Sequence, residues 1–124
     1  MELKEKEKVV KIIGNADIEL LELERRVSEY FSQGKNPPKE DTQLLKSIQN
    51  ALDRLKQNPF AGDNIKKELI PRELSTLQNL FRMELSQFWR LLYYVVGEEV
   101  RVISIVFEII NHKEYDHVFG YKKK

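Results

Sequence analysis

The segment Leu80–Ile110 constrains the fold most, because three strand-like runs follow one another in it at short spacing. Alternating apolar and polar residues are typical of β-strands, in which successive side chains point to opposite faces of a sheet. The runs predict strands over Leu80–Leu85, Trp89–Val96 and Val100–Ile110. The connections between them are short enough for hairpins, so we expect these strands to pair antiparallel.

The register between the first two strands follows from matching their apolar faces. If Leu85 lies opposite Trp89, the apolar faces coincide and the loop between the strands has three residues. This register sets Glu84 across from Arg90. A two-residue turn would instead set Met83 across from Arg90 and bury a guanidinium against a thioether, which is energetically costly. We therefore predict the three-residue loop.

One face of the predicted sheet collects charged side chains. Arg82 shares a face with Glu84 and Arg90. Either length of the following turn brings Arg101 onto the same face, near Tyr94. The third strand is apolar on both faces, as expected of a central strand that is covered from both sides. We expect helices to cover one face and the end of the chain to cover the charged one.

Two amphipathic helices are predicted upstream, on either side of Pro37 and Pro38. Neither proline can continue a helix, because each lacks an amide donor and disfavours α geometry in the residue before it. The first helix covers Asn15–Gly34, with the asparagine as N-cap and the glycine as stop, and the second covers Lys39–Asn58 or begins at Asp41. We expect an antiparallel hairpin packed on the sheet. Its apolar stripes comprise Leu20, Leu23, Val27 and Phe31, then Leu44, Leu45, Ile48, Leu52 and Leu55.

The remaining segments complete a single α+β domain over residues 1–124. Val9–Ile13 is short and β-branched, which predicts an edge strand. Pro59–Asn79 predicts a long ordered loop with a helical turn at Arg72–Leu77, and His112–Tyr121 predicts a short C-terminal cap. We expect an N-terminal strand, then the antiparallel helical hairpin on an antiparallel sheet of about four strands, then this cap. Residues 1–8 and 122–124 are predicted to be frayed ends.

Composition limits the possible functions. The chain has 124 residues, 41% of them hydrophobic, which suffices for one modest core. The absence of cysteine excludes disulfides, thiolate metal sites and cysteine nucleophiles, and suits a reducing cytoplasm. No apolar run approaches the roughly 20 residues of a transmembrane helix and the N-terminus does not resemble a signal peptide, so we expect a cytoplasmic protein without membrane contact. With a net charge of +1, any nucleic-acid binding must use a local basic patch.

The order and spacing of these segments resemble the RelE/ParE toxin superfamily, especially its longer prokaryotic relatives. The resemblance covers roughly residues 9–121. It is carried by the helical hairpin, by NPFAG at 58–62 followed by lysines and a proline, by the strand pair FRMEL and WRLLY, by the long apolar strand, and by the ending HKEYDHVFGY.

This resemblance implies a function. RelE-like members cleave messenger RNA on the ribosome, ParE-like members poison DNA gyrase, and a small antitoxin usually neutralises either kind. The chain is therefore expected to be the toxin of a type II toxin–antitoxin pair. Its expected partners are a cognate antitoxin, mRNA and the ribosome, and no cofactor is expected. The resemblance does not choose between the two activities.

Metal-free RNA cleavage needs a base for the ribose 2′-OH, cations for the phosphorane and an acid for the leaving 5′-oxygen. By the resemblance, Arg90 matches the arginine that contacts the scissile phosphate. Arg82 lies where the family often has a basic residue, which would bind a second phosphate oxygen. Glu84 lies where related ribonucleases have a lysine or a carboxylate, so it is either the general base or the ion partner of Arg90.

The C-terminal motif supplies the other expected groups. His112 and Lys113 match the basic position after the last strand. The aromatic position falls on Tyr115 or on Phe119; Tyr115 would act as acid or orienter, whereas Phe119 would leave the site without a hydroxyl. The candidate catalytic residues are thus Arg82, Glu84, Arg90, His112 and Tyr115, and the candidate RNA-binding residues are Lys66, Lys67, Arg101 and Lys113.

Each of these residues also has a structural interpretation. Arg82, Glu84 and Arg90 are consistent with a cross-strand ion network, and His112 with a polar group that ends a strand. Lysine pairs commonly face solvent without a further role. Two histidines five residues apart with no further ligands predict no metal site. The alternative functions are a ParE-like gyrase inhibitor, an inactive binding protein of the same fold and a regulatory domain without toxicity.

Overall fold

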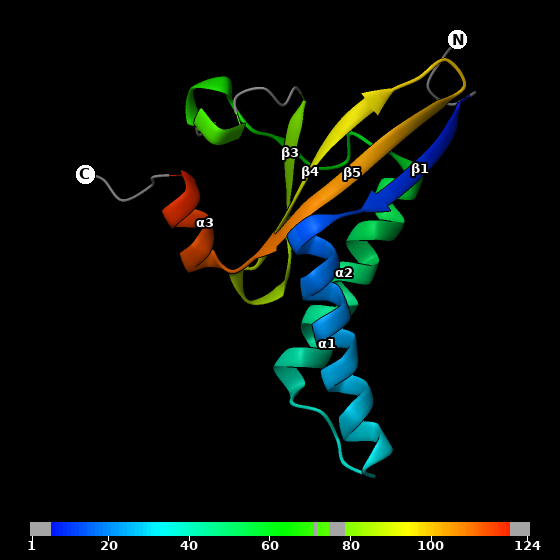
Figure 1. Cartoon of the computed structure of the whole chain (residues 1–124), viewed down its shortest axis with the longest axis vertical. Coiled ribbons are helices and arrows are strands. Elements are labelled where there is room, and N and C mark those ends of the chain that lie inside the picture. The colour runs from blue at the N-terminus through cyan, green and yellow to red at the C-terminus, as the bar shows by residue number, and fades with distance from the viewer. Residues whose placement is uncertain (1–5, 71, 75–78, 120–124) are drawn as a thin grey trace.

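The computed structural model describes residues 6–70, 72–74 and 79–119 and has an α+β architecture (Figure 1). Among these residues the sheet order is β1-β5-β4-β3-β2. The strands are β1 (Glu7–Ile12), β2 (Asp63–Asn64), β3 (Leu80–Glu84), β4 (Arg90–Gly97) and β5 (Arg101–Ile110), and the helices are α1 (Gly14–Ser32), α2 (Lys39–Gln57) and α3 (His112–Phe119).

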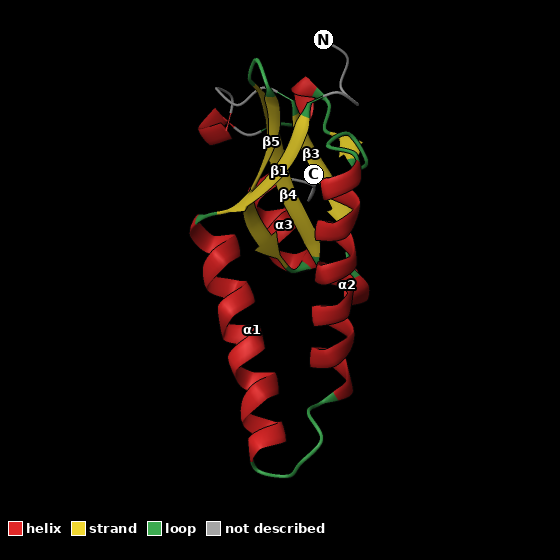
Figure 2. Cartoon of the chain, turned by 90° about the vertical axis from the view of Figure 1, so that its right-hand side faces the viewer, coloured by secondary structure: helices red, strands yellow, loops and turns green. Residues whose placement is uncertain are grey.

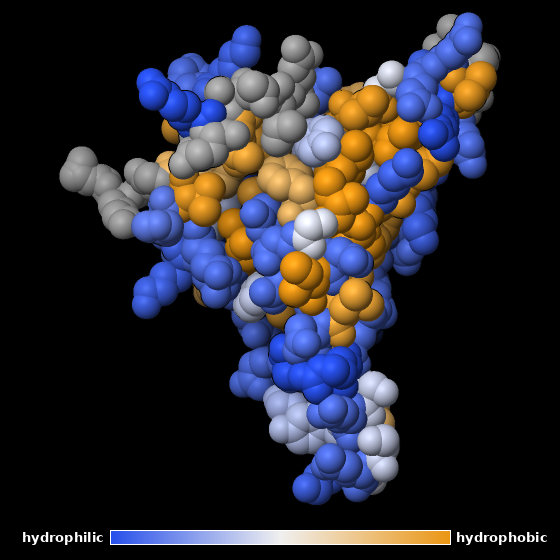
Figure 3. Space-filling view, viewed as in Figure 1, coloured by the Kyte–Doolittle hydropathy of each residue, from blue (hydrophilic) through white to orange (hydrophobic). Residues whose placement is uncertain are grey.

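The sheet lies between two unequal helical layers. Helices α1 and α2 cover one face, and α3 lies on the other (Figures 1 and 2). The α1–α2 hairpin is thus packed on the sheet and α3 caps its opposite face, as predicted. Figure 3 shows apolar surface over β1 and β5 beside α3, so α3 covers only part of its face. Among the described residues, no helix is long and apolar enough to cross a membrane.

The predicted antiparallel sheet of about four strands is wrong in two respects. Strand β1 pairs with β5 in parallel, from Glu7 opposite Arg101 to Ile12 opposite Val106. The two helices and three further strands lie between β1 and β5, which supplies the long crossover that a parallel pair needs. In addition, β2 forms within the predicted loop and adds a fifth strand beside β3. The sheet is therefore mixed, with β1 at its edge as predicted.

Several predicted boundaries shift. Residues 7 and 8, predicted to be frayed, belong to β1, whereas residues 1–5 and 120–124 lie outside the described residues. The long loop contains β2 and two short 3-10 turns, Lys67–Leu69 and Arg72–Leu74. The rest of the helical turn predicted at Arg72–Leu77 lies outside the described residues.

The register predicted for β3 and β4 is confirmed. Glu84 is the partner of Arg90, and the Leu85 N–H donates to the Trp89 carbonyl at 2.8 Å across the three-residue loop. The prediction of Arg101 beside Tyr94 is wrong. Tyr94 is paired with Ile105, whereas Arg101 adjoins the β4–β5 turn, where its carbonyl accepts from the Glu98 N–H.

Helix α1 begins and ends differently from the prediction. It starts at Gly14, whose φ is +58°, with Ile13 as N-cap. Asn15, the predicted N-cap, lies inside the first turn and donates from Nδ2 to Glu108 Oε1 at 2.7 Å. At the other end Phe31, predicted to be part of the buried stripe, is 59% exposed, because the far turns of the hairpin extend beyond the sheet (Figure 2).

The end of α1 explains the requirement for Gly34. Its φ is +73°, and its N–H donates to the Phe31 carbonyl while the Lys35 N–H donates to the Tyr30 carbonyl. This pair of bonds is the Schellman arrangement, which favours glycine because no Cβ is present. The predicted stop is confirmed.

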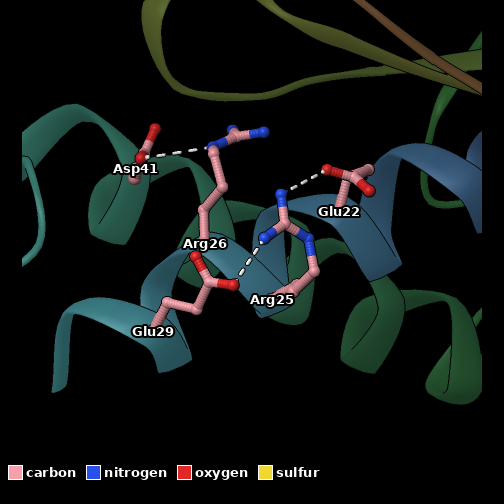
Figure 4. A network of polar contacts seen from close by, with 5 residues as sticks. All are labelled: Glu22, Arg25, Arg26, Glu29 and Asp41. Atoms are coloured by element: carbon pink, nitrogen blue, oxygen red, sulfur yellow. Dashed lines mark hydrogen bonds and ion pairs between the residues drawn. The ribbon is translucent and has the colours of Figure 1, made fainter. Parts of the chain in front are cut away.

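A network of polar contacts lies on the hairpin (Figure 4). Arg25 bonds Glu22 at 2.9 Å and Glu29 at 2.8 Å within α1, and Arg26 reaches Asp41 of α2 at 3.5 Å. These side chains are mostly exposed, so solvent screens each pair and it contributes little to stability. The hairpin depends on burial of its apolar stripe.

Two apolar cores lie on opposite faces of the sheet. The larger joins the hairpin to a sheet face that includes Phe81, Met83, Leu91 and Tyr93. The smaller joins α3 to the other face; its buried members are Ile65, Leu80, Leu92, Ile110, Tyr115 and Phe119. The second core fixes the position of α3.

Gly62 is needed where β2 meets β3. Its N–H donates to the Tyr93 hydroxyl at 2.9 Å. A Cβ built on Gly62 would lie 2.7 Å from the Arg82 carbonyl oxygen and 2.9 Å from the Tyr93 hydroxyl oxygen, both closer than a methyl group tolerates. Gly62 thus lets β2 approach the strand that carries Arg82.

We predict that Gly62→Ala lowers the free energy of unfolding by about 1–3 kcal/mol, because β2 must move away from β3. Gly97→Ala is the matched control, since a Cβ there meets nothing within 4 Å, and should change stability by less than about 0.5 kcal/mol. Urea denaturation of the two variants measures both effects. Equal stability of the two variants would contradict the close approach at Gly62.

Candidate functional site

Charged and aromatic side chains from three elements meet where β3, β4 and α3 come together. Arg82 of β3 donates from Nη1 to the Tyr115 hydroxyl of α3 at 2.7 Å. The guanidinium carbon of Arg90 on β4 lies 4.5 Å from the centroid of the Tyr115 ring, and that of Arg82 lies 5.6 Å from it. The Tyr115 ring therefore holds two cations on one side of the sheet.

The chain turns into α3 through a capping box. The Glu114 N–H donates to Asn111 Oδ1 at 2.8 Å, and the Asn111 N–H donates to Glu114 Oε1 at 3.3 Å. Because this cap follows β5 directly, α3 turns back over the sheet. Tyr115 and Phe119 then face inward, with ring centroids 4.4 Å apart. His112, in the first turn, is left beside Arg90.

Arg90 connects Glu84 of β3 with His112 of α3. Its side chain is only 14% exposed; Nε donates to Glu84 Oε2 at 3.3 Å, and Nη1 lies 3.3 Å from His112 Nδ1. A guanidinium only donates, so Nδ1 accepts and the ring proton is on Nε2. That nitrogen lies 3.2 Å from Asp116 Oδ2. The His112 ring is thus held between a cation and a carboxylate.

Tyr115 and Phe119 occupy different places in the cluster. Tyr115 is fully buried, and its ring contacts both arginines. Phe119 is stacked against that ring. A hydroxyl in this position binds a guanidinium and does not face solvent, so Tyr115 is suited to orient Arg82 rather than to deliver a proton.

The residues of the predicted site separate into two groups. Arg82, Glu84, Arg90, His112 and Tyr115, predicted as catalytic residues, are joined by the contacts described above. The predicted RNA-binding residues are spread over the surface. Arg101 lies at the distant β4–β5 turn, where it donates to Glu98 Oε1 at 2.6 Å. Lys66 and Lys67 are exposed near Leu80, at the opposite end of β3 from Glu84, and Lys113 is exposed on α3. The structure brings together the first group and leaves most of the second outside it.

Sequence reasoning missed Phe88. It lies in the β3–β4 loop, it is 69% exposed, and its ring centroid is 5.9 Å from that of His112. The available signal was a large apolar side chain in a loop of three residues, next to a strand that carries a predicted site arginine.

A groove of about 610 Å³ lies on the other side of α3, toward the start of α1. It is lined by Asn15, Glu108, Ile110, Lys113, Glu114, His117 and Val118. Burial raises the pKa of Glu108, and the nearby Glu114 carboxylate raises it further, while the Asn15 hydrogen bond opposes the shift. Burial and the same Glu114 carboxylate also raise the pKa of Glu19. The Glu114 carboxylate thus disfavours the ionised form of both Glu108 and Glu19.

We predict that Glu108→Gln stabilises the protein at pH 8, because it removes an ionised carboxylate from a half-buried position and keeps an oxygen for the Asn15 amide. A folded-state pKa above the unfolded one means that stability is lost as pH rises through it. The gain should therefore shrink as pH falls toward 4, where the parent carboxyl is protonated. Thermal melts at both pH values measure it, with the exposed Glu24→Gln as control. An equal gain at both pH values would contradict this explanation.

Comparison with known proteins found no relative. A scan against models of protein families, a search of curated proteins and a search of solved structures each gave no match to the chain. Among the described residues, there is also no group of three histidine, aspartate or glutamate side chains that could hold a metal ion. Interpretation of the site therefore depends on its geometry.

Proposed function

We propose that the protein is a RelE-like endoribonuclease, the toxin of a type II toxin–antitoxin pair, which cleaves translated mRNA in the cytoplasm without a metal ion and is bound by a cognate antitoxin. One observation carries the proposal. Two guanidiniums, those of Arg82 and Arg90, contact one buried tyrosine ring beside a histidine. Paired guanidiniums match the oxygens of a phosphate diester.

The charge on the phosphorane explains why two arginines are useful. When the 2′-oxygen attacks phosphorus, negative charge gathers on the non-bridging oxygens, and donors fixed before the reaction stabilise it most. Tyr115 fixes Arg82 through a hydrogen bond and Arg90 through its ring face. Arg82 is thus oriented before substrate arrives. Arg90 is held beside it and exchanges its bonds to Glu84 and His112 for bonds to the phosphate.

His112 is the better candidate for the general base. Its Nδ1 lone pair, released when Arg90 turns to the phosphate, takes the proton of the 2′-OH, while Asp116 stabilises the resulting imidazolium through Nε2. The new 2′-O–P bond replaces the P–O5′ bond, and the leaving oxygen takes its proton from water. Glu84 is exposed and lies on the other side of Arg90, where it serves as an alternative base.

A non-catalytic protein of the same fold, such as a ParE-like gyrase inhibitor or an inactive relative, is the second candidate. Burial of Tyr115 and the cross-strand pair of Glu84 with Arg90 favour it, because both features are also expected of an ion network that only stabilises the docking of α3. The two candidates differ in what the loss of Arg90 should do.

We predict that Arg90→Ala lowers the rate of RNA cleavage by about 100- to 1000-fold and abolishes growth arrest on expression, since it removes a main donor to the phosphorane. Tyr115→Phe keeps the ring but releases Arg82, and should reduce cleavage by about tenfold. Arg25→Ala, an exposed arginine on α1, is the control and should cleave as the parent does. Circular dichroism verifies that each variant folds. If growth arrest persists in folded Arg90→Ala and Tyr115→Phe, the protein acts without cleaving RNA.

A further inference from the structure

The backbone at Phe88 is unusual for its residue type. Gln87 and Phe88 have φ values of +59° and +65°, in the left-handed region. Such conformations are costly for residues with a Cβ, and a bulky aromatic residue is a particular outlier there. Asn79, also left-handed, is of a type that tolerates it. Phe88 belongs to neither core cluster of the described residues. The fold gains no buried ring from this strain.

The strained loop is firmly attached to α2. The Gln87 amide donates from Nε2 to the Glu40 carbonyl at 3.1 Å, and the Ser86 N–H donates to Ser47 Oγ at 3.2 Å. These bonds attach the first two residues of the loop to α2, and the Trp89 N–H closes the bend by donating to the Ser86 carbonyl at 3.2 Å. The backbone that carries the exposed Phe88 ring is therefore held in place. An exposed ring on a backbone that is already ordered is suited to bind a flat partner, because little conformational entropy is lost on binding.

The Phe88 ring also adjoins the proposed phosphate site. Its centroid is 5.9 Å from the ring of His112, which contacts Arg90 through Nδ1. A nucleotide with its phosphate on Arg90 would therefore have an exposed aromatic face beside it. Aromatic rings next to basic side chains are the usual platform for unpaired bases of single-stranded nucleic acid.

We propose that Phe88 stacks on an unpaired base of single-stranded RNA, next to the phosphate bound by Arg90. The inference rests on the proposed function and adds a base-binding residue to it. Stacking tolerates any base, so Phe88 contributes affinity and sets the position of the strand without reading sequence through hydrogen bonds. The strain in the loop is then retained because it presents the ring.

Fluorescence anisotropy with a labelled 2′-O-methyl RNA hexanucleotide tests this directly, because the probe lacks the attacking hydroxyl and is not cleaved. Phe88→Ala should weaken binding by about 5- to 150-fold, the usual range for one stacked base, while Phe88→Trp retains it. Phe31→Ala, another exposed phenylalanine, is the matched control. Phe88→Asn suits the left-handed backbone, so it should fold at least as stably as the parent and still bind weakly.

Salt dependence separates stacking from phosphate contact. Stacking releases no counterions, so Phe88→Ala should keep the parent slope of log affinity against log salt, whereas Arg90→Ala should reduce the slope by roughly one phosphate contact, about 0.7 for single strands. If Phe88→Ala binds as the parent does while Arg90→Ala is weakened, stacking is wrong and the phosphate site stands. If Phe88→Ala binds RNA as the parent does but no longer arrests growth, the ring contacts a protein and the inference is wrong. If the parent binds no RNA, both proposals fail.

Discussion

The contact of two arginines with one tyrosine ring is the interaction on which the candidate site depends. Arg82 and Arg90 would repel each other if they were held close without compensation. Tyr115 offers its hydroxyl to one and its ring face to the other, and Glu84 neutralises Arg90 from the side. The tyrosine is itself fixed by the smaller core. The site therefore exists only when α3 is docked.

The two faces of the sheet have different tasks. The hairpin face carries the larger core, which supplies most of the apolar burial. The other face has a smaller core beneath α3. The polar groups of the candidate site lie at the border of this core, around Tyr115. Gly62 links the two, because its N–H bonds to Tyr93 of the larger core while its backbone lies against the carbonyl of Arg82. Packing on the hairpin side thus influences the strand that carries a site arginine.

Local side-chain patterns predicted the centre of the fold well. The facing pair of Glu84 and Arg90 followed from matching the apolar faces of the two strands, because the alternative register would have set Met83 against Arg90. The covering role of the C-terminal segment followed from a strand that is apolar on both faces. These predictions succeeded because burial of one face constrains them strongly.

Other features depend on tertiary structure that no local pattern encodes. The parallel direction of β1 depends on how the hairpin returns the chain to the sheet, and β2, with two residues, is too short for periodicity to detect. Arg101 lies on the predicted face of the sheet but at the β4–β5 turn and not beside Tyr94. The alternation of side chains along a strand determines the face on which a residue lies, but not its distance from residues of the neighbouring strand. Asn15 is a good N-cap by type, yet Glu108, far away in sequence, offers it a partner. Exposure of Phe88 results from a backbone bend that sequence does not show.

The central claim, that Arg82 and Arg90 together bind an RNA phosphate, is tested most directly by nitrogen–proton correlation spectra of the arginine side chains. The Nε–H signals would be followed while a 2′-O-methyl RNA is added. The account predicts that the signals of Arg82 and Arg90 shift together and saturate at one RNA concentration, while that of Arg25 on α1 stays in place. Unchanged Arg82 and Arg90 signals at saturating RNA, or equal shifts at all three arginines, would contradict it.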